Sequence, residues 1–123
     1  MRTVMIVDDQ KDIGHLVGTL LRYAGHQSIW VEDGRKALEL ISHTPPHLIL
    51  LDIMMPIMSG FDVLAELRSD AAHDNIPVVM LTAVADAAMQ EKARRLGAND
   101  YLVKGSDWDE MLVRIERQLK NLN

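Results

Sequence analysis

Residues that carry a charge or a hydroxyl group directly follow four short apolar segments of the chain. Asp52 ends the unbroken apolar run at 48–51, where a carboxylate cannot enter a core without a partner. The complete set is Asp8 and Asp9, Asp52, Thr82 and Lys104. Each residue alone would fit a helix cap or a solvated loop. The occurrence of the whole set at successive strand ends predicts that these residues form one chemical site.

The three aspartates of this set would repel one another in a fold that brought them together. Two like charges ~4 Å apart cost about 4 kcal/mol at an effective dielectric constant of about 20. A cluster of Asp8, Asp9 and Asp52 therefore needs a cation or a shared proton. Oxygen ligands with open coordination positions favour Mg²⁺ over zinc, so the sequence predicts a magnesium site.

Five strand-like segments alternate with five amphipathic helical segments, and this order must position the site. The expected strands span 3–7, 27–31, 48–51 and 78–81, and a fifth runs from 100 or 101 to 103. The expected helices span 12–24, 33–42, 61–68, 86–96 and the segment that Asp107 caps. Such alternation predicts an α/β fold with a parallel sheet covered on both faces. Five units of this size favour the flavodoxin-like, doubly wound (βα)5 order 2-1-3-4-5, whose ligands bind beyond the carboxyl ends of strands 1 and 3.

Composition narrows the class of protein and its partners. The 123 residues suffice for a single domain, 1–123, with a real core. A net charge of -5 gives no attraction to nucleic acid or to an anionic membrane, so we expect neither as a direct partner. The absence of cysteine excludes a disulfide framework and fits a cytoplasmic location. The N-terminal segment is not a signal peptide, and no apolar stretch approaches the ~20 residues that span a bilayer.

Four motifs resemble those of the receiver domain of two-component response regulators. They are VDD at 7–9, LLDIMMPIMSG at 50–60, LTA at 81–83 and GANDYLVK at 97–104. The resemblance covers essentially the full length of the chain. It implies a phosphorylation-controlled signalling switch that catalyses its own Mg²⁺-dependent aspartyl phosphorylation and dephosphorylation without being a conventional metabolic enzyme.

The resemblance also assigns roles to individual residues. Asp52 would accept a phosphoryl group from the phosphohistidine of a sensor histidine kinase or phosphotransfer protein. Asp9, Asp52 and the backbone carbonyl of Met54 would ligate Mg²⁺ directly, and Asp8 would act largely through water. Thr82 would donate a hydrogen bond to one phosphoryl oxygen, and Lys104 would form an ion pair with another. This chemistry is sound, because a carboxylate can be a nucleophile and the metal and lysine would stabilise the transferring group.

Tyr101 matches the switch aromatic residue of this family. The implied mechanism moves Thr82 toward the phosphoryl group and turns Tyr101 inward, which shifts a two-state equilibrium. The surface that changes would be the fourth helix, fifth strand and fifth helix, where a downstream protein or output domain would bind. The alternative for Tyr101 is an ordinary, half-buried strand residue.

Three positions near the expected site are distinctive. The family usually has a proline in a cis peptide after the lysine, whereas Lys104 precedes Gly105. A cis bond before a non-proline residue is costly, so a trans peptide or a more mobile loop is the alternative, and the resting placement of Lys104 stays open. We expect Gly105 to permit the same turn at a higher entropic cost. Met54 and Val84 are apolar and cannot orient an attacking water molecule, which predicts slow self-dephosphorylation.

Other functions fit the residues less well. A magnesium-dependent phosphatase of small substrates would need an Asp-x-Asp pair, but Ile53 and Met54 follow Asp52. A flavin-binding protein of this fold would need a phosphate loop rich in Ser, Thr or Gly, but the acidic loop after the first strand repels phosphate. A pseudo-receiver that binds partners without phosphorylation is the remaining alternative, and the presence of every chemical residue weighs against it. The chain could be a stand-alone regulator or part of a larger protein.

Overall fold

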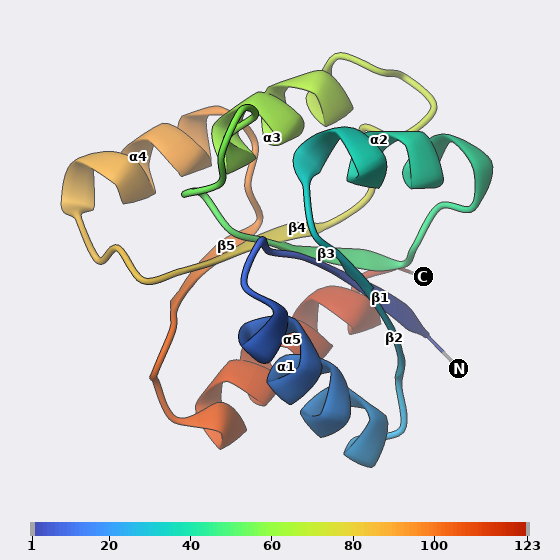
Figure 1. The fold of residues 1–123 in the computed structure, drawn as a ribbon, viewed down its shortest axis with the longest axis vertical. Helices are drawn as coiled ribbons and strands as arrows, with labels where there is room; N and C mark the ends of the chain where they lie inside the picture. Colours follow the sequence, from blue (N-terminus) through green and yellow to red (C-terminus); the bar gives the residue numbers. More distant parts are fainter. Residues whose placement is uncertain (1, 123) are drawn as a thin grey trace.

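The computed structural model describes residues 2–122 and has one five-stranded parallel sheet in the order β2-β1-β3-β4-β5. The strands are β1 (Thr3–Val7), β2 (Gln27–Val31), β3 (Leu48–Leu51), β4 (Val78–Thr82) and β5 (Asp100–Val103). The helices are α1 (Lys11–Tyr23), α2 (Gly34–His43), α3 (Gly60–Arg68), α4 (Ala87–Arg95) and α5 (Trp108–Lys120). Helices α1 and α5 cover one face, and α2, α3 and α4 cover the other (Figure 1). The predicted fold class is confirmed; of the predicted domain, residues 1 and 123 lie outside the described part.

Small differences between predicted and observed boundaries have local causes. Helices α2 and α4 begin one residue later than predicted because the expected first residues are N-caps. The carboxylate of Asp33 accepts a hydrogen bond from Lys36 N at 2.8 Å, and that of Asp86 accepts one from Ala88 N at 2.7 Å. Strand β4 continues through Thr82, which the sequence placed just after the strand.

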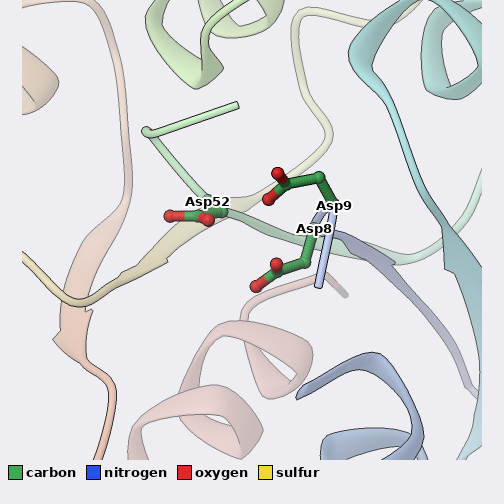
Figure 2. A group of neighbouring side chains, drawn as sticks. All are labelled: Asp8, Asp9 and Asp52. Atoms are coloured by element: carbon green, nitrogen blue, oxygen red, sulfur yellow. The ribbon is translucent and has the colours of Figure 1, made fainter. Parts of the chain in front are cut away.

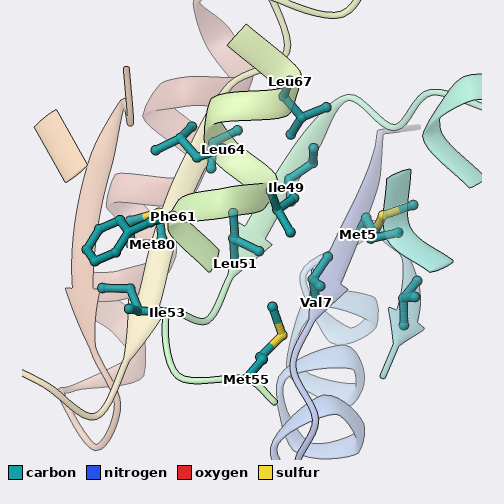
Figure 3. Packing of buried hydrophobic residues seen from close by; sticks show 14 of the residues in the cluster. Met5, Val7, Ile49, Leu51, Ile53, Met55, Phe61, Leu64, Leu67 and Met80 are labelled. Carbon is teal, nitrogen blue, oxygen red and sulfur yellow. The ribbon is translucent and has the colours of Figure 1, made fainter. Parts of the chain in front are cut away.

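The central strand β3 is buried on both of its faces, as its continuous apolar run predicts. Leu48 and Leu50 face the core under α1 and α5, whereas Ile49 and Leu51 face the core under α2, α3 and α4. Figure 3 shows the second of these cores, where Leu64 and Leu67 of α3 pack over the sheet. The two cores therefore fix the carboxyl end of β3, which carries Asp52, from both sides.

Ile57 in the loop between β3 and α3 has a strained backbone. Its φ angle is 70°, and its side chain is fully exposed. A left-handed conformation costs an L-residue about 1–2 kcal/mol, and a β-branched residue adopts it rarely. The side chain gains no burial that would offset this cost.

We expect Ile57→Asn to raise the free energy of unfolding by about 1 kcal/mol, because asparagine tolerates left-handed backbone. Urea denaturation measures the change. Ile57→Val is the matched control, since valine keeps the branch at Cβ and should leave stability unchanged. A less stable Ile57→Asn protein would contradict this account.

Candidate functional site

The carboxyl ends of the central strands bring the predicted acidic residues together. Asp8 and Asp9 follow β1, and Asp52 follows β3. One carboxylate oxygen from each of these three residues lies within 4.8 Å of the other two. Figure 2 shows the three carboxylates directed toward the same space beyond the strand ends. The structure thus confirms the convergence that strand order predicts.

Backbone hydrogen bonds hold two of these acids one step beyond the strands. Asp8 N donates to Val31 O at 3.1 Å, and Asp52 N donates to Val7 O at 3.0 Å. Both bonds continue the parallel ladders that pair Val7 with Val31 and with Leu51. The sheet register therefore sets the positions of Asp8 and Asp52 relative to each other.

Gly60, the first residue of α3, permits a close approach behind Asp52. A Cβ atom at position 60 would lie 2.1 Å from the backbone oxygen of Asp52. Gly60 N donates to Ile53 O at 2.9 Å, and Met54 N donates to the Asp52 Oδ1 atom at 3.4 Å. The β3–α3 loop is therefore packed directly against the acid, with the Met54 backbone beside its carboxylate.

Lys104 supplies the positive charge within the acidic cluster. Its Nζ lies 2.7 Å from Asp8 Oδ2 and 3.2 Å from Asp52 Oδ2, and it donates to Gln10 Oε1 at 3.2 Å. Asp8 and Asp52 are 2% and 4% exposed, so their charges have little contact with water. Gln10 is not among the predicted site residues, because its only signal in the sequence is its place directly after the acidic pair.

The pKa values of this ion pair reflect burial and mutual attraction. Burial raises the pKa of the Asp8 carboxyl, and hydrogen bonds from Lys104 and Gln10 offset this only in part. Burial also acts to lower the pKa of Lys104, but the hydrogen bond to Asp8 and the charge of Asp52 outweigh it, so that pKa is raised. Lys104 therefore stays charged, whereas Asp8 holds its charge at an energetic cost.

Gly105 adopts the turn that the sequence leads us to expect after Lys104. Its φ is 89°, in the left-handed region that favours glycine, and the peptide bonds among the described residues are all trans. With this trans peptide, Lys104 Nζ lies 3.2 Å from Asp52 Oδ2, so the resting lysine is directed at this carboxylate.

Thr82 and Tyr101 are both linked to the backbone of Val84. The fully buried Thr82 accepts a hydrogen bond from Val84 N through Oγ1 at 3.4 Å, and the half-buried Tyr101 hydroxyl donates to Val84 O at 2.6 Å. Lys104 N donates to Thr82 O at 2.8 Å. One backbone segment thus connects the hydroxyl at the site to the aromatic residue on β5, a link that residue types alone did not reveal.

The donor set fits a small divalent cation. The three acids offer oxygen ligands only, one of them exposed and two buried, and these lie close enough to share one ion. The ammonium group of Lys104 already sits against two of them, which shows that the cluster accommodates positive charge. Oxygen ligands of this kind suit Mg²⁺, which retains several water molecules and accepts phosphate oxygens.

Comparison with known proteins agrees with this geometry. The family model of the response regulator receiver domain matches residues 4–116. The chain belongs to this family. It is 38% identical over 120 residues to the DNA-binding dual master transcriptional regulator RpaA of Synechocystis, covering 98% of this chain and 50% of that protein. It is also 38% identical to the probable transcriptional regulator ycf27 of Guillardia theta, covering 98% and 46%. The chain spans about half the length of these curated relatives.

Solved structures show the same receiver fold. The receiver domain of the Francisella response regulator 1452 has a TM-score of 0.92 and 29% identity, with all of both chains covered. The chemotaxis response regulator CheY4 of Vibrio cholerae has a TM-score of 0.89 and 29% identity, covering 96% of this chain and 98% of the other. Within residues 2–122 of this receiver domain, no helix has the length and apolar character needed to cross a bilayer.

The raised pKa of Asp8 predicts a pH-dependent stability in the absence of Mg²⁺. Between the ordinary value of 3.8 and the raised pKa, the folded protein holds a proton that the unfolded chain has lost. The contribution of Asp8 to stability is therefore present at low pH and is lost as the pH rises through the raised pKa. We expect Asp8→Asn to stabilise the protein by about 1 kcal/mol near neutral pH, and by less as the pH approaches 3.8.

Urea denaturation over a pH series measures this difference between wild type and Asp8→Asn. Asp9→Asn is the control, since Asp9 is exposed and its replacement should change stability little. Parallel pH profiles for wild type and Asp8→Asn would contradict the assignment of an energetic cost to the buried Asp8 charge.

Proposed function

We propose that this receiver domain is a phosphorylation-controlled signalling switch with Asp52 as its phosphoryl acceptor. The observation that carries the proposal is the position of Asp52. Its carboxylate lies in the acidic cluster with Asp8 and Asp9, and it is 3.2 Å from the Lys104 ammonium. Carboxylates that could serve as nucleophile and as metal ligands lie with a cation at the carboxyl edge of the sheet, where ligands bind in this type of fold, and this supports the proposal.

We assign the metal site to this chain's own oxygen atoms. Asp9, Asp52 and the Met54 backbone carbonyl would hold Mg²⁺ directly, and Asp8 would do so largely through water. The bound ion would neutralise charge on the transferring phosphoryl group. A solved relative, response regulator Rcp1, is described in an Mn²⁺-bound form; it has a TM-score of 0.81 and 27% identity to this chain. That relative supports the binding of a divalent cation by this chain.

The transfer would make one bond and break one. A carboxylate oxygen of Asp52 attacks the phosphorus atom of a phosphohistidine on a sensor histidine kinase or phosphotransfer protein. The bond from phosphorus to nitrogen breaks, and its electron pair returns to the imidazole. Lys104 would move from Asp8 to a phosphoryl oxygen, and the Thr82 hydroxyl would donate to another, so that both stabilise the developing charge.

The connection through Val84 would carry the signal away from Asp52. When Thr82 Oγ1 turns toward the phosphoryl group, it leaves Val84 N, and the segment to which Tyr101 is bonded becomes free to shift. The surface of α4, β5 and α5 would then change its affinity for a downstream protein or output domain. A local change in hydrogen bonding can shift such a two-state equilibrium.

Intact mass after incubation with acetyl phosphate tests the proposal. We expect a gain of one phosphoryl group that requires Mg²⁺, is labile to hydroxylamine and is absent from Asp52→Asn, because only an acyl phosphate at Asp52 meets all three conditions. A protein that binds Mg²⁺ yet gains no mass would instead be a pseudo-receiver.

The apolar side chain of Met54 predicts a long-lived phosphoryl group. Met54 is 59% exposed beside Asp52 and cannot orient a water molecule for attack. We expect Met54→Asn to speed self-dephosphorylation several-fold, because an amide can hold such a water, while Met54→Leu leaves the rate unchanged. The decay of phosphorylated protein by intact mass measures both rates. Loss of the phosphoryl group from wild type within seconds would oppose this prediction.

A further inference from the structure

The indole of Trp30, on the edge strand β2, is bonded to the backbone at the acidic site. Its Nε1–H donates to the carbonyl oxygen of Asp8 at 2.8 Å. The β1–β2 ladder ends with Asp8 N donating to Val31 O, after which the chain turns into α2 at its N-cap, Asp33. The Asp8 carbonyl therefore lies just beyond the last backbone bond of the β1–β2 ladder, and its donor is the Trp30 side chain.

The indole of Trp30 packs against helix α1 at Gly14 and His15. A Cβ atom at Gly14 would lie 2.3 Å from Trp30 Cδ1 and 2.6 Å from Nε1, so only glycine lets the ring lie against the helix. The ring of His15 meets the indole edge-on, with the ring centroids 5.6 Å apart. The indole is therefore wedged between β2 and the first turns of α1, which begins at Lys11 just after the acidic pair.

The bonded carbonyl belongs to the peptide unit that joins Asp8 to Asp9. The Asp8 side chain has further fixed points, since Oδ1 accepts from Gln10 N at 2.8 Å and Oδ2 pairs with Lys104. Within residues 2–122, the exposed carboxylate of Asp9 forms no hydrogen bond or ion pair. The direction of Asp9 therefore depends on its backbone, and the indole fixes the peptide plane that leads into it.

We propose that Trp30 is a positioning residue for the divalent-cation site, acting through the Asp8–Asp9 peptide rather than by touching the ion. This inference rests on the proposed magnesium site. Loss of the indole N–H frees the Asp8–Asp9 peptide to rotate. Binding of the cation must then also order Asp9, and this lowers the affinity for the cation. The residue matters for metal affinity although it lies on the strand at the edge of the sheet.

Magnesium titration by calorimetry, alongside thermal unfolding, separates this role from simple packing. Trp30→Phe keeps an aromatic ring and removes the donor. We expect it to weaken Mg²⁺ binding about 3- to 10-fold, the effect of one neutral hydrogen bond. Gly14→Ala should weaken binding similarly, because it displaces the ring. Trp108→Phe makes the same chemical change at the other of the two tryptophans and should leave the affinity unchanged.

The outcomes of this titration are distinct. Unchanged Mg²⁺ affinity in Trp30→Phe, with or without a lower melting temperature, would reduce the indole to a packing role and overturn the proposal. A wild-type protein that binds no Mg²⁺ would overturn the metal site itself and, with it, this inference. Weakened binding in Trp108→Phe to the same extent would also overturn it, since the effect would not depend on the bond to Asp8.

A second measurement does not require Trp30 to be replaced. In Trp108→Phe, Trp30 is the one remaining indole of the chain. We expect its Nε1–H to give a ¹⁵N NMR signal that exchanges slowly with solvent and shifts when Mg²⁺ saturates the site, because the bonded peptide leads into a metal ligand. A signal that exchanges freely, or that does not respond to Mg²⁺, would contradict the proposal.

Discussion

The concentration of negative charge at one edge of the sheet is the constraint on which the site depends. Three carboxylates with oxygen atoms within 4.8 Å of one another, two of them buried, are stable only beside positive charge. In this structure Lys104 provides it, at 2.7 Å from Asp8 and 3.2 Å from Asp52. A metal ion and a phosphoryl group would change this balance, because the ion neutralises the acids and the phosphoryl oxygens attract the lysine. The charges of Lys104 and the aspartates thus stabilise the resting state, and their redistribution would produce the proposed response.

The fold supplies this arrangement through register and burial. The two cores bury β3 from opposite sides, so Asp52 follows a strand that is fully packed on both faces. Ladder bonds to Val7 and Val31 hold the neighbouring acids in line, and Gly60 lets the following loop pack behind Asp52. The proposed output surface lies farther along the same edge, where the Val84 backbone is hydrogen-bonded to both Thr82 and Tyr101. Buried strands therefore position the residues of the site, while the link to the proposed output surface runs through a loop.

Much of this could be predicted from the sequence, because buried parallel strands leave a strong signal. The apolar run before Asp52 and the regular alternation of segments predicted the sheet order, and that order placed Asp8 beside Asp52. Other features left no such signal. The strain at Ile57 depends on a backbone angle, and the bond from Trp30 to the Asp8 carbonyl depends on three-dimensional contact across the sheet edge. Side chains that act through the backbone of another residue are not visible as a motif.

A crystal structure with Mg²⁺ and beryllium trifluoride, a mimic of the phosphoryl group, would test the proposed exchange of charges at Asp52. We expect beryllium to be bonded to Asp52, the ion to be held by Asp9, Asp52 and the Met54 carbonyl, and Lys104 to have moved from Asp8 onto a fluorine atom. Lys104 still paired with Asp8, or turned away from Asp52, would contradict the proposed exchange of charges.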